Sequence, residues 1–164
     1  MGEIVMSKIS NENEDYFVED IMVARLLSYA ILIYTRVVPE TEYKENLHAY
    51  FLKDPNNSLL LELEWRTSDI QYSINVIIDY ARKNDVDYDT FGGFLISKLE
   101  EIYYQDDMDI KYFGSKMYLV WSELPSEIQN KEPFRILCYA DDPLSWEDEN
   151  QSREIYQRMF HYYK

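Results

Sequence analysis

The sequence predicts an all-α fold, a single-domain bundle of about six to seven helices over residues 1–164. Four glycines and five prolines are few for a sheet-rich chain of this length, which needs many turns. Apolar residues recur at helical spacing in most segments. A hydrophobic fraction of 46% supplies enough apolar side chain for a core, so a disordered chain is not expected.

The first helix is expected over residues 14–35, after an irregular N-terminal lead-in at residues 1–13. Acidic residues cluster near its start, which suits the positive end of the helix dipole, and Pro39 prevents its continuation. Residues 41–53 repeat aromatic and leucine side chains at helical spacing, which predicts a second helix. The Asp-Pro-Asn-Asn sequence at residues 54–57 predicts a turn after it.

Residues 59–65, Leu-Leu-Leu-Glu-Leu-Glu-Trp, fit two kinds of structure. Their alternation suits a half-buried strand, and pairing with the preceding segment would give an α+β fold with a small hairpin around residues 46–66. Leucine and glutamate are helix formers, however, and the run holds no β-branched residue. We therefore favour a helix, with Ser58 as its capping residue.

Sequence signals for helix starts mark the remaining elements. Ser68 and Gln71 form a capping box, which predicts a helix that ends in the cations Arg82 and Lys83. Asp109 is expected to cap another helix, which Pro125 closes. Three further helices are expected over residues 90–104, 133–140 and 152–163. Glycines 92 and 93 stand in the first turn of the 90–104 helix, and such a pair often lets another segment approach closely.

The net charge of −15 bounds what the protein binds. Residues 1–82 hold 14 acids and 7 Lys or Arg, and residues 83–164 hold 17 and 9, so the excess is not confined to a tail. Such a surface repels nucleic acids and anionic membranes and attracts basic proteins. With no spanning segment and no signal peptide in the sequence, we expect a cytoplasmic protein that binds neither membrane nor nucleic acid.

No motif in the sequence fixes a reaction or a cofactor. The single cysteine excludes an intramolecular disulfide, and both a nucleophile elbow and a phosphate-binding glycine loop are missing. Glu45 and His48 have the Glu-x-x-His spacing of helical di-iron sites, but such sites need a second motif and two more glutamates. We expect no cofactor and no metal site. A helical metal-dependent enzyme using Glu45, His48 and nearby carboxylates stays open as an alternative, as does a structural homo-oligomer subunit.

Two segments, residues 103–109 and 139–149, interleave tyrosine and tryptophan with carboxylates. Tyr and Trp dominate interface hot spots, and surrounding acids steer a basic partner, although the same aromatics would also suit a core. The sequence therefore predicts an acidic protein-binding module, such as a bacterial immunity protein that inhibits a basic, nuclease-type toxin. The predicted partner-binding residues are Tyr104, Asp106, Asp107, Asp109, Asp141, Asp142, Trp146 and Asp148.

Overall fold

The computed structural model describes the backbone of residues 2–164 and the side chains of residues 18–164. Every regular element in this part of the chain is helical, so the all-α prediction is confirmed and the alternative hairpin does not form. The elements are α1 (Gly2–Tyr34), α2 (Thr41–Lys53), α3 (Ser58–Trp65), α4 (Ile70–Lys83), α5 (Tyr88–Tyr103), α6 (Ile110–Ser122), α7 (Ser126–Gln129), α8 (Ile136–Tyr139), the 3-10 helix η1 (Asp142–Trp146) and α9 (Glu149–His161).

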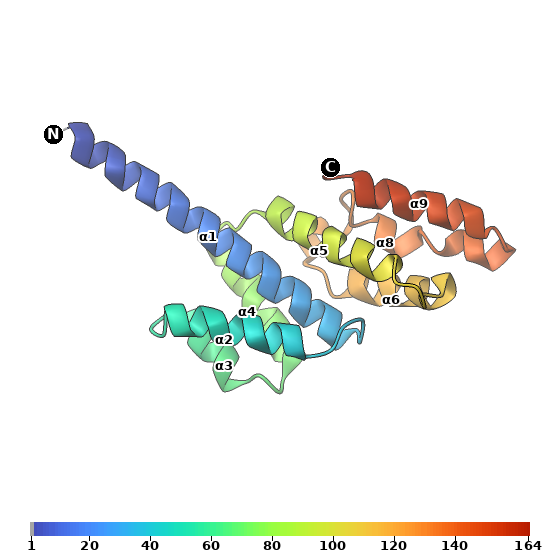
Figure 1. The fold of residues 1–164 in the computed structure, drawn as a ribbon, viewed down its shortest axis with the longest axis horizontal. Coiled ribbons are helices and arrows are strands. Elements are labelled where there is room, and N and C mark those ends of the chain that lie inside the picture. The colour runs from blue at the N-terminus through green and yellow to red at the C-terminus, as the bar shows by residue number, and fades with distance from the viewer. Residues whose placement is uncertain (1) are drawn as a thin grey trace.

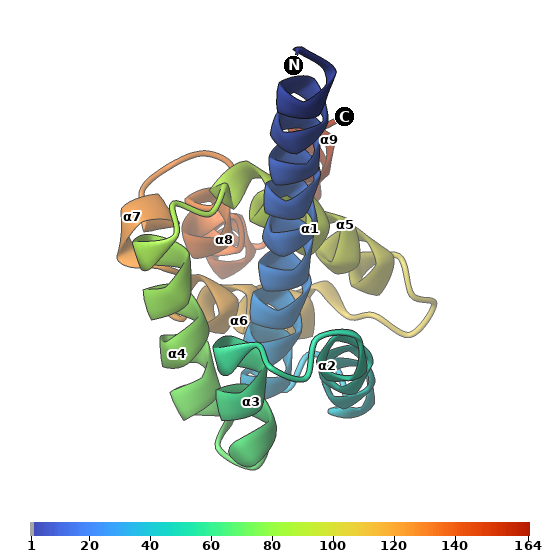
Figure 2. The same ribbon diagram turned by 90° about the vertical axis from the view of Figure 1, so that its left-hand side faces the viewer.

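The C-terminal half of α1 is a central helix. From Met22 to Ile33 every side chain except that of Arg25 is buried, because α5, α4 and α2 pack around it. Its N-terminal part extends beyond the other helices (Figures 1 and 2). The irregular lead-in expected over residues 1–13 is wrong, since α1 already begins at Gly2. Neither proline nor glycine occurs between residues 3 and 38, so the chain offers nothing that stops a helix there.

Helices α2 and α3 form an antiparallel hairpin across a short turn. The leucine-rich run is helical, as favoured from its composition, and buries Leu59, Leu60 and Leu63. Its cap is Asn57 rather than Ser58: the Asn57 side-chain oxygen accepts hydrogen bonds from the backbone N–H groups of Leu59 (3.0 Å) and Leu60 (3.2 Å). Asparagine satisfies two free N–H groups here, which fixes the first turn of α3.

Aspartates cap the later helices. Asp109 caps α6 as predicted. Helix α4 is capped by Asp69 instead of Ser68, and α5 is capped by Asp87 and begins at Tyr88, two residues before its expected start. Helix α9 begins at Glu149 behind the cap Asp148, whereas we expected it to begin near residue 152. In each case a carboxylate that accepts from the first backbone N–H groups sets the start of the helix ahead of the apolar periodicity.

The C-terminal part of the chain packs onto α5, which links it to α1. Only residues 136–139 of the expected 133–140 helix are α-helical, as α8, and it packs against α6 and α9. The short elements α7 and η1 were not expected, because four or five residues carry too little periodicity to be recognised. Buried side chains from α1 to α9 form one continuous cluster. None of the helices in the described residues combines the length and apolarity that crossing a membrane requires.

Candidate protein-binding site

The two aromatic and acidic segments of the sequence come to the same end of the molecule. The loop of residues 104–109 leaves α5, and residues 141–148 lead into α9, at the right of Figure 1. Helices α5 and α9 pack together, and the ring centroid of Tyr104 lies 6.1 Å from that of Phe160 near the C-terminal end of α9. We call residues 104–109 and 141–149 the acidic end.

Seven of the eight predicted partner-binding residues are exposed at the acidic end, and five of these seven cap no helix with their side chains. Tyr104 is 59% exposed and Trp146 is 60% exposed, which is unusual for side chains of this size. Asp106, Asp107 and Asp142 are exposed and form no ion pair with any described side chain. The acidic end therefore presents two exposed aromatic rings together with carboxylates that form no ion pair among the described side chains.

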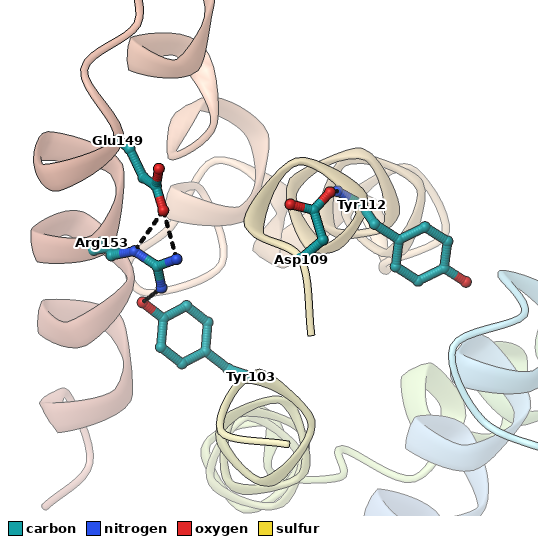
Figure 3. A network of polar contacts seen from close by, with 5 residues as sticks. All are labelled: Tyr103, Asp109, Tyr112, Glu149 and Arg153. Carbon is teal, nitrogen blue, oxygen red and sulfur yellow. Dashed lines mark hydrogen bonds and ion pairs between the residues drawn. The ribbon is translucent and has the colours of Figure 1, made fainter. Parts of the chain in front are cut away.

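Asp109 and Asp148 are exposed, but their side chains also cap helices. The Asp109 carboxylate accepts a hydrogen bond from the backbone N–H of Tyr112 at 3.2 Å (Figure 3). The Asp148 carboxylate accepts from the backbone N–H of Gln151 at 3.1 Å. These bonds hold the carboxylates in place at the first turns of α6 and α9. Both residues thus add negative charge to the acidic end, and their hydrogen bonds fix the backbone where α6 and α9 begin.

Asp141 is half-buried against α6. A Cβ atom at Gly114 would lie 2.7 Å from the Asp141 Cβ and 3.3 Å from the Tyr156 hydroxyl, so only glycine allows this close approach. Burial raises the pKa of the Asp141 carboxyl, and the charge of Asp142 raises it further. Tyr156 is buried beneath, and burial raises the pKa of its hydroxyl as well. Asp141 therefore packs against α6, and only part of its side chain belongs to the exposed surface of the acidic end.

A polar network that the sequence analysis missed ties α9 to α5 (Figure 3). Glu149 accepts hydrogen bonds from Arg153 Nε at 3.0 Å and Nη2 at 2.6 Å, and Arg153 Nη1 donates to the Tyr103 hydroxyl at 3.1 Å. The i,i+4 spacing of Glu149 and Arg153 is a sequence signal for the pair. Because Glu149 offsets the charge of Arg153, this cation does little to reduce the negative field of the acidic end.

The Glu-x-x-His motif lies elsewhere, on α2. His48 Nδ1 is 3.7 Å from a carboxylate oxygen of Glu64 on α3, and Glu45 is exposed. Among the described side chains, no group of three or more His, Cys, Asp or Glu lies close enough together to hold a metal ion. Nothing in this arrangement favours the metal-dependent alternative.

Compared with family models, curated proteins and solved structures, the chain gives no match. Its function is therefore inferred from the surface chemistry of the chain itself.

Proposed function

We propose that the chain is a protein-binding module whose acidic end occupies a basic surface of another protein. The observation that carries this proposal is that two segments distant in the sequence come to one end of the molecule, and that together they expose carboxylates and the rings of Tyr104 and Trp146. In its sharpest form the module is an inhibitor of the immunity-protein kind. A nuclease site is basic because it binds phosphates, and carboxylates of a protein inhibitor carry the same sign of charge as that substrate.

The ring of Tyr104 is held in place by neighbouring aromatic rings of the chain itself. Tyr104 packs edge-on against Tyr103, with ring centroids 4.9 Å apart and an angle of 87° between the rings. An exposed ring whose position is already fixed loses little conformational entropy on binding. A fixed aromatic ring within an acidic rim is the arrangement expected of an interface hot spot with an electrostatically steered partner.

Affinity capture with the full chain tests the proposal. The immobilised protein is exposed at low and at high salt to a lysate of the organism that encodes it, beside the variants Asp106→Lys and Asp142→Lys. A basic protein retained by the wild type at low salt, released by high salt and lost with both variants supports the proposal. The matched control is Asp79→Lys, which makes the same charge change on an exposed residue of α4. Equal loss with all three variants would contradict a localised site.

The inhibitor form has its own test. The captured protein is purified, and its cleavage of RNA and DNA is measured as the chain is added. A fall in nuclease activity that ends at a one-to-one ratio is expected. A captured basic protein whose activity is indifferent to the chain would leave a binding module but refute the inhibitor.

A further inference from the structure

Three large apolar side chains stand exposed on the α2–α3 hairpin. Trp65 is 84% exposed, more than any other large apolar side chain in the described residues, and Leu52 and Leu61 are 65% and 47% exposed. Single exposed leucines are common on protein surfaces, but a tryptophan this open beside two leucines is not. We call Leu52, Leu61 and Trp65 the apolar ridge.

The hairpin brings these side chains to one side of the molecule. His48 on α2 lies against Glu64 on α3, with 3.7 Å between the charged atoms. Leu52 follows His48 by one helical turn, and Leu61 precedes Glu64 by nearly one turn, so both leucines lie close to the faces that carry this pair. Since the helices are antiparallel, the two leucines come level with each other. Trp65 lies one turn beyond Leu61 on the same face of α3.

The surrounding side chains leave Trp65 uncovered because they are engaged with α4. The guanidinium of Arg66 lies over the ring of Tyr72 at 4.3 Å from its centroid. The Tyr72 hydroxyl in turn donates a hydrogen bond of 2.5 Å to Glu62. Arg66, the cation next to Trp65 in sequence, is thus stacked on the ring of Tyr72. The contacts of Arg66 and Glu62 with Tyr72 hold α3 against α4.

The charge around the ridge indicates what covers it. Residues 40–69 hold seven acids and three Lys or Arg, a net charge of −4, and one of these lysines, Lys44, is paired with Glu40 at 2.9 Å. If a second copy of the chain docked through the same segment, a net charge of −4 would face a net charge of −4, so the two copies would repel each other. A basic segment is attracted, and its apolar side chains have the ridge to pack against.

We infer that the apolar ridge is a second docking surface, for a basic amphipathic helix of another protein. Such a helix repeats apolar residues every three or four positions, which suits a ridge spread over two packed helices, and its flanking cations face the acids of the hairpin. The hairpin lies on the opposite side of the molecule from α9 (Figures 1 and 2). The ridge is therefore separate from the acidic end, and the inference does not depend on the proposed function.

Fluorescence anisotropy with a labelled peptide tests this inference on the full chain. The probe is a synthetic Leu/Lys helix of about 18 residues, about 27 Å long, with all leucines on one face. The wild type is expected to bind it, and Trp65→Ala and Leu61→Ser are each expected to weaken binding by at least about tenfold. Leu119→Ser, which removes an exposed apolar side chain of α6 outside both the ridge and the acidic end, is the matched control for Leu61→Ser and is expected to keep the wild-type affinity. Thermal unfolding of each variant confirms that it is folded.

Three results would overturn the inference. The first is unchanged affinity in Trp65→Ala. The second is equal binding of a scrambled peptide of the same composition, which shows attraction by charge alone. The third is a dimer in sedimentation that Trp65→Ala dissociates, which assigns the ridge to a second copy. None of these results involves Asp106 or Asp142, so failure here is distinguishable from failure of the proposed function.

Discussion

Aspartate side chains have two roles in this protein, and individual residues show which role dominates. Asp69, Asp87, Asp109 and Asp148 each accept a backbone hydrogen bond at the start of a helix. Asp106 and Asp107 are exposed and cap none of the helices in the described part of the chain. Part of the large negative charge therefore stabilises helices, and another part is free to attract a partner.

Replacing a capping aspartate separates these roles. Asp109→Ala removes the acceptor for the Tyr112 N–H and is expected to lower the free energy of unfolding by about 1 kcal/mol. For a chain of this size, that corresponds to a melting temperature lower by roughly 2–4 °C. Asp107→Ala, two residues earlier, is the control and is expected to leave stability unchanged. Thermal unfolding followed by circular dichroism measures both, and equal losses would contradict the capping role.

Asp141 gives stability a dependence on pH. Its pKa is raised in the folded state by burial, so the folded chain holds this proton more tightly than the unfolded chain does. The associated stability is fully present below the ordinary value of 3.8 and is lost as pH rises through the raised pKa.

Asp141→Asn is therefore expected to unfold at a higher temperature than the wild type at neutral pH, and to lose that advantage in acid. Melting temperatures across the acid range measure it, with the exposed Asp106→Asn as control. An advantage that stays constant with pH would show that removal of the ionisable group is not its cause.

Helix α5 depends on one member of its glycine pair. A Cβ atom at Gly92 would collide with the Tyr163 hydroxyl and would lie 2.7 Å from the end of the Phe134 ring, whereas one at Gly93 meets nothing within 4 Å. The close approach expected at this pair thus occurs at Gly92, with two aromatic side chains. It allows the C-terminal residues after α9 to pack onto α5.

Alanine at these neighbouring positions should act in opposite directions. Gly92→Ala overpacks the contact and is expected to destabilise by about 1–3 kcal/mol. Gly93→Ala restricts only the unfolded chain and is expected to stabilise by roughly 0.5–1 kcal/mol. Urea denaturation of the two variants measures both free energies. The same sign of change at the two positions would contradict the packing described for Gly92.

The existence of each long helix was predictable, while several boundaries were not. Helix α4 has a strong apolar face and a clear cationic end, and α3 has composition in its favour. The starts of α5 and α9 were placed too late because apolar periodicity begins after the capping aspartate and its first turn. The irregular lead-in predicted over residues 1–13 is wrong because polar residues alone do not stop a helix where proline and glycine are missing.

Over the whole molecule, composition and apolar spacing predicted the fold class, and the sequence interleaves acids with aromatics in two segments. These patterns did not predict which carboxylates are free, because that depends on contacts between distant residues. Arg153 reaches Tyr103 across 50 residues, and Gly114 makes room for Asp141 from another helix. The exposure of Trp65 was not predictable either, because a leucine-rich run does not indicate which of its side chains stays outside the core.

The steering of a basic partner by the acidic end is the central claim, and its most direct measurement is an association rate. Stopped-flow mixing of the captured partner with the wild type, Asp106→Lys, Asp142→Lys and Asp79→Lys is carried out over a range of salt concentrations. We predict that Asp106→Lys and Asp142→Lys slow association by about tenfold at low salt and flatten its salt dependence, and that Asp79→Lys changes the rate far less. Association rates that respond equally to all three reversals would contradict a binding site at the acidic end.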